Sequence, residues 1–309
     1  MEILLKIIIT GGAGFIGSCV VKRLIKDKHD LIIIDDLSSS TLDSLKNVFD
    51  RIVFVNENVL NIDRIEDYFK KTDIVIHLAA IPSVEESIRN PVRVFQVNTL
   101  GTLYLLELCR KHDIDRFIYA SSASVYGNPI YIPIDEEHPC NPLSIYGVSK
   151  YSSELLVLNY YRNYGLKYTI LRLFNVYGPG MKDGVIYHFI RNMLLSKEIV
   201  IYGDGRQTRD FIYVDDVSEA IHCVINYPRN NVYNIGSGQG ISINQLFNKV
   251  RSILGLNVEP VYKPSRTGDI EHSIANINRA INEIGWRPKT SLEDGLVKTI
   301  EYFKQKLGV

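Results

Sequence analysis

The hydrophobic residues in the first half of the chain form short, uninterrupted runs separated by longer stretches with helical periodicity. The runs, rich in β-branched residues, span 6–10, 31–35, 51–55, 73–79, 116–121 and 168–174. Because these runs are apolar throughout rather than at alternate positions, each predicted strand is expected to be covered on both faces. The pattern therefore predicts an α/β fold with a doubly wound parallel sheet between two helical layers.

The pattern becomes less regular after the turn-like NVYGPG at 175–180. The following segment contains turn-rich stretches at 202–207 and 236–240 and predicted short helices at 215–227 and 242–254. We predict a first domain over residues 1–175 and a smaller, discontinuous α/β substrate domain over 176–309. The apolar run 232–236 is expected to return to the main sheet, so part of 208–241 would rejoin the first domain.

Charge and composition narrow the classes of partner. The chain has 309 residues, 46% of them hydrophobic, and its 35 basic residues balance 35 acidic ones. A net charge of zero predicts no general attraction to nucleic acid or to an anionic membrane. The first residues, MEILLKIIIT, lack the features of a signal peptide, and no apolar run of about 18 residues follows. We therefore expect a cytoplasmic protein.

The four cysteines do not indicate a metal site. Cys19, Cys109, Cys140 and Cys223 are widely separated, with no C-x-x-C pair. We expect reduced thiols and no bound metal.

A glycine-rich turn follows the first predicted strand. In TGGAGFIGS the glycines can be read as G-x-G-x-x-G from Gly12 or as G-x-x-G-x-x-G from Gly11, Gly14 and Gly17. Glycines between a strand and a helix permit a tight turn and a close approach of a pyrophosphate to the helix N-terminus. Asp35 ends the second strand, 18 residues after Gly17. A carboxylate there accepts hydrogen bonds from ribose hydroxyls and repels a 2′-phosphate, which predicts NAD rather than NADP.

Tyr146 and Lys150 lie four residues apart in SIYGVSKYSSE. On a helix these two side chains share a face. A phenol with an ordinary pKa near 10 is about 3 pH units from useful basicity at neutral pH. A nearby ammonium and a bound nicotinamide ring would both favour the phenolate, so the pair predicts a general base tuned by positive charge. The chain has 19 tyrosines, and packing is the alternative interpretation.

Several motifs together resemble the extended short-chain dehydrogenase/reductase family, in its nucleotide-sugar epimerase and dehydratase branch. They are TGGAGFIG, HLAA, SSASVYG, YGVSK, RLFNVYGPG and GDGRQTRDFIYVDDV, and they extend over nearly the whole chain. The resemblance implies a Rossmann-like first domain with Tyr146, Lys150 and Ser122 as the catalytic residues. It also implies NAD contacts from Gly11, Gly14, Phe15, Ile16, Gly17, Asp35, Asn58, Val59, Ala79, Ala80, Asn98, Tyr146 and Lys150.

One motif departs from the family pattern. Where the family shows Gly-Asp followed by a hydrophobic residue, this chain has Glu57, Asn58 and Val59. Asn58 retains an amide that can hydrogen-bond adenine.

The resemblance also implies a substrate site for a UDP-sugar. It assigns substrate contacts to Ser122, Ser124, Tyr146, Asn175, Val185, Arg209, Arg266 and Ser273. Guanidinium groups bind phosphate oxygens in pairs, so Arg209 and Arg266 suit the diphosphate.

Two positions bear on the type of reaction. Sugar 4,6-dehydratases of this family carry Asp-Glu directly before Val-Tyr-Gly, whereas this chain has Ala123 and Ser124. Without those carboxylates, elimination of water is disfavoured. The resemblance then implies a 4-epimerase, in which C4 of the sugar is oxidised transiently and reduced on its other face.

The sugar itself is open to several interpretations. In 4-epimerases of this family a residue seven positions after the diphosphate arginine lies near the C2 substituent, and counting from Arg266 gives Ser273. A small side chain leaves room for an acetamido group, so UDP-N-acetylglucosamine is expected to be accepted as well as UDP-glucose. UDP-glucuronate 4-epimerisation or decarboxylation, and a non-catalytic dinucleotide-binding role, are the alternatives.

Two predicted helices suggest self-association. The helices at 91–111 and 145–164 carry apolar residues beyond those needed to cover the sheet, namely Leu103, Leu106, Leu155 and Leu158. In the family such helices pair into a four-helix interface, which implies a homodimer; burial within one subunit is the alternative.

Overall fold

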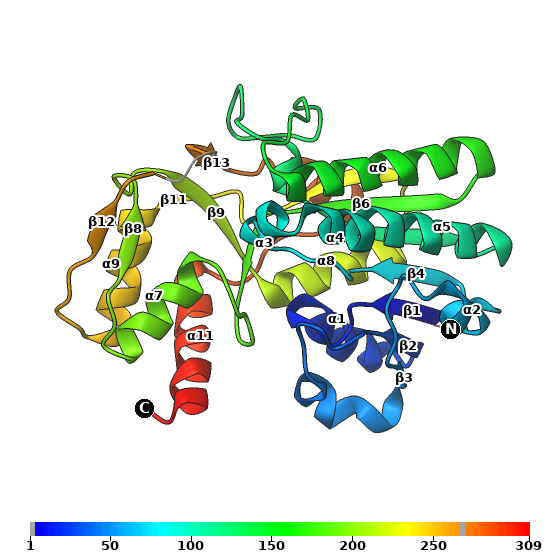
Figure 1. The fold of residues 1–309 in the computed structure, drawn as a ribbon, viewed down its shortest axis with the longest axis horizontal. Helices are drawn as coiled ribbons and strands as arrows, with labels where there is room; N and C mark the ends of the chain where they lie inside the picture. Colours follow the sequence, from blue (N-terminus) through cyan, green and yellow to red (C-terminus); the bar gives the residue numbers. More distant parts are fainter. Residues whose placement is uncertain (1–3, 266–269) are drawn as a thin grey trace.

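The computed structural model describes residues 4–265 and 270–309 and contains a central sheet of seven strands (Figure 1). The strands, in spatial order, are β10 (Asn231–Ile235), β6 (Lys167–Leu173), β5 (Arg116–Ser122), β4 (Ile74–His77), β1 (Lys6–Thr10), β2 (Asp30–Ile34) and β3 (Val53–Val55). All neighbouring strands in this sheet are parallel. The order reverses direction between β1 and β4, and in such sheets ligands bind outside the carboxyl ends of the strands near that point.

The predicted strands are present, and the run 232–236 does return to the main sheet as β10 beside β6. The predicted strand 51–55 is shortened to Val53–Val55, because a 3-10 helical segment, Leu42–Arg51, continues to its first residue. Boundaries of this kind depend on where a preceding turn ends, which a run of apolar residues does not specify.

Helices cover both faces of the sheet, as the uninterrupted apolar strands predicted. One layer contains α1 (Phe15–Leu24), α8 (Val214–Asn226) and α10 (Asn278–Ile284); the other contains α2 (Ile62–Phe69), α5 (Gly101–Lys111) and α6 (Ile145–Tyr164). Ile7 and Ile9 pack into the first core, while Ile8 between them packs into the second. Successive side chains of a strand point to opposite faces, so both must be apolar when both faces are covered.

A smaller lobe lies at the left of Figure 1 and has its own hydrophobic core. It contains α7 (Val185–Leu194), α9 (Ile243–Leu254), α11 (Leu292–Leu307) and the parallel pair β8 (Val200–Tyr202) and β12 (Val261–Lys263). A second sheet is centred on β9 (Thr208–Tyr213), which pairs with β7 (Asn175–Tyr177), β11 (Gly240–Ser242) and β13 (His272–Ser273). The division into domains at residue 175 remains our proposal.

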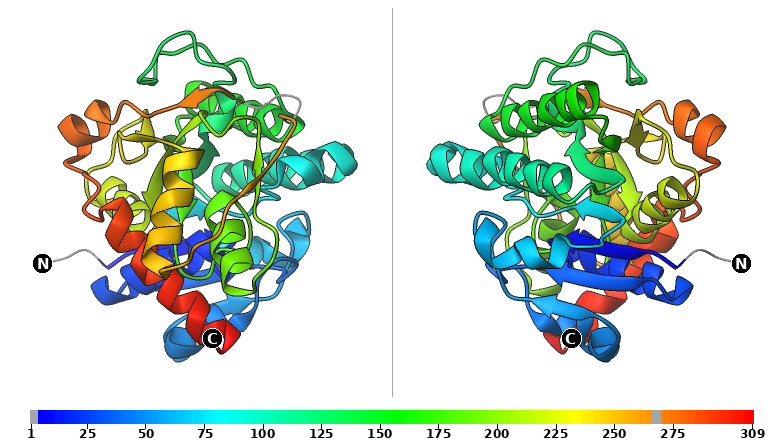
Figure 2. Two further views of the ribbon diagram at one scale, coloured as in Figure 1. Left: turned by 90° about the vertical axis from the view of Figure 1, so that its left-hand side faces the viewer. Right: turned by 90° about the vertical axis from the view of Figure 1, so that its right-hand side faces the viewer.

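The segment between β5 and α6 projects from the rest of the molecule (Figure 2). It starts with a 3-10 turn, Ala123–Val125, and returns at Ser144, whose hydroxyl accepts a hydrogen bond from the Gly147 N–H and so caps α6. The cap fixes the start of the helix that carries Tyr146.

The helix predicted over 91–111 consists of α4 (Pro91–Phe95), a π-helical turn (Gln96–Leu100) and α5, preceded by the short α3 (Val84–Arg89). For Leu106, of the two interpretations left open, burial within one subunit holds: its side chain is completely buried in the subunit's own core. Leu103 and Leu158 also pack partly against that core, whereas Leu155 is 50% exposed. No helix in the described part of the chain is long and apolar enough to cross a membrane.

Candidate active site

A cavity of about 1120 Å³ opens at the carboxyl ends of the central strands. Most of the residues predicted to contact a cofactor line it: Gly11, Gly14, Phe15, Ile16, Gly17, Asp35, Asn58, Val59, Ala79, Ala80, Tyr146 and Lys150. These residues come from the ends of β1, β2, β3 and β4 and from the helices α1 and α6. Parallel strands place their carboxyl ends at one edge, so residues distant in sequence converge there.

The glycine turn has the geometry that a pyrophosphate requires. A side-chain carbon at Gly17 would lie 2.1 Å from the Gly11 carbonyl oxygen, so the close contact between turn and helix depends on glycine. At Gly14, by contrast, the nearest atom to such a carbon would be that same oxygen at 3.1 Å, with nothing else within 4 Å. Gly14 is the N-cap of α1 and offers no side-chain cap. The N–H groups of the first helical turn are thus available to an anion.

Asp35 is held at the end of β2 and is 8% exposed. Its Oδ2 accepts a hydrogen bond from the Ala13 N–H at 3.0 Å, and its Oδ1 accepts from the Leu37 N–H and the Ser40 hydroxyl at 2.9 Å each. These bonds orient the carboxylate at the cavity wall. A carboxylate held in this position can accept hydrogen bonds from the ribose hydroxyls in the adenosine half of NAD.

Asn58 lines the cavity but its amide is already engaged. Its Nδ2 donates to Asp36 Oδ2 at 2.5 Å, and its Oδ1 accepts from the Leu60 N–H at 2.9 Å. Asn58 thus orients a second carboxylate beside Asp35, and its contact with adenine stays a prediction.

Tyr146 lines the cavity near the start of α6. Burial raises the pKa of Tyr146, and a hydrogen bond with Ser122 opposes this shift. We expected Lys150 to lower the pKa of the phenol. In the protein without a bound cofactor, however, the increase of the pKa caused by burial is larger than the effects that lower it. The phenol therefore holds its proton until further positive charge is brought to it.

Lys150 is 4% exposed. Its Nζ donates to the Ala120 carbonyl oxygen at 2.8 Å and lies 5.0 Å from the centre of the Tyr119 ring. Burial lowers the pKa of Lys150 to about 7, while the Glu154 carboxylate opposes this shift. The amine therefore loses its proton more readily than that of an ordinary lysine.

The two predicted serines lie where β5 enters its 3-10 turn. The Ser122 hydroxyl accepts a hydrogen bond from the Ser124 N–H at 3.2 Å. The Ser124 hydroxyl is buried and has no hydrogen-bond partner among the described residues. A buried hydroxyl without a hydrogen-bond partner destabilises the folded protein. A ligand bound at this turn could supply the missing partner.

Ser122 and Ser124 are not among the residues that line this cavity, and neither are the remaining predicted residues. Asn98 is buried and binds the backbone of Ile81 and the Ser149 hydroxyl. Asn175, Val185, Arg209 and Ser273 belong to or border the smaller lobe. Arg209 on β9 and Ser273 on β13 are directly opposite each other in the second sheet. Arg266 lies outside the described residues.

Several cavity residues were not predicted from the sequence. They include Ser121, Asp36, Arg93 and Lys182. The Lys182 ammonium donates to the Ser39 carbonyl oxygen at 2.5 Å and so connects the segment before α7 to the segment after β2. Asp36 directly follows the predicted carboxylate and could have been found from that position, whereas a contact across 143 residues leaves no local signal.

Fold and cavity together define a dinucleotide-dependent enzyme with a tyrosine and a lysine beside the cofactor site. A model of the NAD dependent epimerase/dehydratase family matches residues 7–236, and the chain belongs to this family. NAD is accordingly its cofactor.

Two relatives resemble the chain along its whole length. A Methanocaldococcus jannaschii protein provisionally named as a UDP-glucose 4-epimerase is 42% identical over 304 residues, covering 96% of this chain and 98% of the relative. The UDP-glucose 4-epimerase of Mycolicibacterium smegmatis is 34% identical, covering 98% and 99%.

Solved structures share the fold closely. UDP-glucose 4-epimerase of Thermotoga maritima with UDP-glucose has a TM-score of 0.94 at 41% identity, covering 98% of this chain and 100% of that chain. UDP-N-acetylglucosamine 4-epimerase of Methanobrevibacter ruminantium, in complex with UDP-N-acetylmuramic acid, has a TM-score of 0.94 at 35% identity, covering 99% and 100%. UDP-glucuronic acid 4-epimerase of Bacillus cereus with UDP-glucuronic acid and NAD has a TM-score of 0.93 at 34% identity, covering 98% and 100%.

Proposed function

We propose that this protein is a UDP-sugar 4-epimerase that interconverts UDP-glucose and UDP-galactose, and UDP-N-acetylglucosamine and UDP-N-acetylgalactosamine. One observation carries the proposal: Tyr146 and Lys150 line the same cavity as the glycine turn and Asp35. The positions before Val125, Ala123 and Ser124, have no carboxylate for removal of water. The names of the similar epimerases agree with this reaction.

In the proposed mechanism Tyr146 removes the proton from the sugar 4-hydroxyl. NAD, when bound, supplies an acceptor for the C4 hydride and afterwards its donor. Ser122, hydrogen-bonded to Tyr146, binds the same substrate oxygen and keeps it near the phenol. Lys150 would contribute positive charge and hold the cofactor at its ribose. After the 4-keto sugar rotates in the site, Tyr146 returns the proton, and the configuration at C4 is inverted.

We propose that the smaller lobe holds the UDP portion. Arg209 and Arg266 would bind the diphosphate, since guanidinium groups form paired hydrogen bonds with phosphate oxygens. Asn175 lies beside this region, with its amide donating to the Asp210 carbonyl oxygen at 3.1 Å. Val185 and Ser124 would complete the contacts to substrate.

Acceptance of N-acetylated sugars rests on Ser273. Its side chain is small and it sits directly opposite Arg209 in the sheet, which supports a position near the sugar diphosphate. A second candidate, 4-epimerisation of UDP-glucuronate, is favoured by the similarity to the Bacillus cereus 4-epimerase. Decarboxylation of the same sugar is the other alternative that the sequence leaves open.

A proton NMR time course tests the function directly. Purified protein is incubated with UDP-N-acetylglucosamine, UDP-glucose or UDP-glucuronate in separate samples, with and without added NAD, and the anomeric signals are followed. Appearance of the galacto isomers supports the proposal. Conversion of UDP-glucuronate alone would show that UDP-glucuronate is the substrate and that the other two sugars are not. Release of carbon dioxide would indicate decarboxylation. No conversion of any sugar would leave a non-catalytic dinucleotide-binding role.

We further propose that the protein is a cytoplasmic homodimer formed through α4, α5 and α6. Leu155 on α6, Val92 on α4 and Ile88 on the preceding α3 are exposed, which supports a contact there. A single monomer boundary in sedimentation velocity at micromolar protein would contradict the dimer.

A further inference from the structure

A buried ion pair lies directly beneath the proposed catalytic residues. Glu154 on α6 is 1% exposed and Arg172 on β6 is 7% exposed, measured on their side chains. Arg172 Nη2 donates to Glu154 Oε2 at 2.7 Å, and its Nε donates to Glu154 Oε1 at 3.1 Å. Charged side chains are almost never fully buried unless they are paired, and such a pair is often no more stabilising than two apolar residues. The Glu154–Arg172 pair is therefore expected to have a role other than stabilising the fold.

The carboxylate of this pair touches the strand end that lines the cavity. The Ser121 hydroxyl donates to Glu154 Oε1 at 2.5 Å, and Ser121 is itself a cavity residue. Arg172 lies directly opposite Ser121 in the parallel pairing of β5 and β6. Lys150, one helical turn before Glu154, donates to the adjacent Ala120 carbonyl oxygen. Glu154 thus shares its neighbours with the proposed catalytic lysine.

The guanidinium of the pair fixes the other side of the catalytic turn. Arg172 Nη1 donates to the Tyr126 hydroxyl at 3.0 Å and to the Glu136 carbonyl oxygen at 3.3 Å. Tyr126 directly follows the 3-10 turn that contains Ser124, and its hydroxyl donates to Asn234 Oδ1 at 2.6 Å. The turn is held between Ser121 and Tyr126 by the two members of one ion pair.

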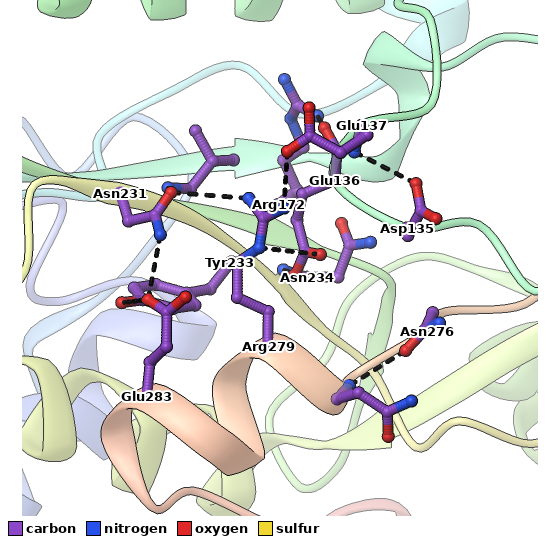
Figure 3. A network of polar contacts seen from close by, with 12 residues as sticks. Asp135, Glu136, Glu137, Arg172, Asn231, Tyr233, Asn234, Asn276, Arg279 and Glu283 are labelled. Carbon is purple, nitrogen blue, oxygen red and sulfur yellow. Dashed lines mark hydrogen bonds and ion pairs between the residues drawn. The ribbon is translucent and has the colours of Figure 1, made fainter.

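Arg172 also belongs to a wider polar network (Figure 3). Glu136, whose side chain is 3% exposed, accepts a hydrogen bond from the Asn234 N–H at 2.8 Å and lies 3.5 Å from Arg279. Arg279 in turn donates to Glu137 at 2.6 Å. Glu136 is therefore a second buried, arginine-paired carboxylate in the same network, away from Lys150.

Lys150 faces few charged or titratable groups. His77 on β4 and Tyr119 on β5 lie close to it, and Tyr146 and Glu154 share its helix. Burial and the nearby Lys150 lower the pKa of His77 to about 3, so His77 is neutral at working pH. Tyr119 is uncharged because burial raises its pKa. Arg172 repels an ammonium, and its charge is neutralised by Glu154 at close range. Among these groups Glu154 is the one whose charge favours protonated Lys150.

We propose that Glu154, clamped by Arg172, is a positioning residue that favours the protonated form of Lys150 and holds the end of β5 against the cavity. This inference rests on the proposed function only in giving Lys150 a catalytic role. Neither Glu154 nor Arg172 lines the cavity, so both act through their neighbours.

The variant Glu154→Gln tests the proposal, because it keeps the shape of the side chain and removes its charge. Two properties are measured: the pH dependence of kcat with the sugar that the wild type converts, and the titration midpoint of Lys150. The midpoint comes from NMR of protein with [¹³C]lysine, in which the Lys150 signal is assigned by its loss in Lys150→Met. We expect both the alkaline limb of kcat and the midpoint to move to lower pH by about one pH unit, with KM nearly unchanged. At pH 8 this shift lowers kcat about tenfold.

Glu136→Gln is the matched control. It removes a carboxylate of similar burial from the same network, and Arg279 keeps Glu137 as a partner. We expect neither the Lys150 midpoint nor the alkaline limb to move. A loss of kcat in Glu154→Gln that is uniform over pH, with an unchanged Lys150 midpoint, would reduce Glu154 to a structural residue and overturn the proposal.

Folding is controlled with a second variant. Glu154→Gln leaves the Arg172 charge buried without its partner, so the protein could fail to fold. The double variant Glu154→Gln with Arg172→Met removes both charges and is expected to shift the Lys150 midpoint in the same direction, by less than the single variant, because the repulsion from Arg172 is removed as well. An unshifted midpoint in the folded double variant would also overturn the proposal. Because the NMR titration needs no turnover, it gives an answer even if the wild type epimerises none of the sugars, a result that would contradict the proposed function alone.

Discussion

The cofactor side and the sugar side of this protein are built in different ways. The cofactor side combines backbone and side chains from the ends of adjacent strands, with Gly11, Gly14 and Asp35 in a short stretch of chain. The residues proposed for the sugar diphosphate come from the smaller lobe, where Arg209 and Ser273 meet through the pairing of β9 with β13. The first side follows from local motifs and strand order, whereas the second depends on how two lobes pack.

The largest effect is expected where the two sides meet, at Tyr146. In Tyr146→Phe the base is lost while the ring remains, so turnover should fall by about 10²–10⁴-fold. NAD should stay bound, because the glycine turn and Asp35 are unchanged. Turnover is measured by NMR and bound NAD by its absorbance after denaturation. Turnover close to that of the wild type would remove Tyr146 from the mechanism.

The glycine turn tests the cofactor side alone. Gly17→Ala places a carbon 2.1 Å from the Gly11 carbonyl oxygen, so the turn must move, at a cost of about 1–3 kcal/mol in the free energy of unfolding. Gly14→Ala is the matched control for folding, since its added carbon meets only one atom at 3.1 Å. We expect Gly17→Ala to lose both stability and NAD, and Gly14→Ala to lose mainly NAD. Equal denaturation midpoints for the two variants would contradict this difference.

Ser273→Tyr tests the sugar side. A bulky ring should exclude the acetamido group, lowering kcat/KM for UDP-N-acetylglucosamine by about 10–200-fold relative to UDP-glucose. The readout is the ratio of the two kcat/KM values. Because a loss of folded protein lowers both values by the same factor, it does not change the ratio. An unchanged ratio would show that Ser273 is remote from the sugar.

The pH dependence of stability tests the buried lysine. The pKa of Lys150 is about 7 in the folded protein against 10.5 for an ordinary lysine, so between these values the unfolded chain binds more protons. Stability should therefore rise with pH from 7 towards 10.5, by about 1 kcal/mol per pH unit from this residue. The contribution is absent in Lys150→Met. Urea denaturation of both proteins at pH 7.5 and 8.5 measures the difference, and equal slopes would contradict it.

The smallest effect is expected at the contact between Lys182 and Ser39, which joins two segments of the cavity wall. Lys182→Ala removes one exposed hydrogen bond, worth about 1 kcal/mol, and should speed NAD release about fivefold. Stopped-flow fluorescence of bound NADH measures the rate. An unchanged rate would show that this contact does not retain the cofactor.

Much of the fold was predictable because its signals are local. Uninterrupted apolar strands such as 6–10 indicated a sheet covered on both faces, and the return of 232–236 to that sheet was recognised from its apolar character. The sequence left open whether Leu106 lies in an interface or in the subunit's core, since helical periodicity shows which residues are apolar and not which element covers them; the structure buries it in the core.

The sequence by itself determined the class of fold, the glycine turn with Asp35, and the spacing of Tyr146 and Lys150. These features depend on contacts within one turn or one strand, and short-range geometry is specified by neighbouring residues. Only the tertiary structure revealed that burial brings the pKa of Lys150 to about 7, and that Glu154 and Arg172 form a buried pair beneath it. Desolvation and buried charge pairing depend on every element packed around a group, and no run of the chain contains that information.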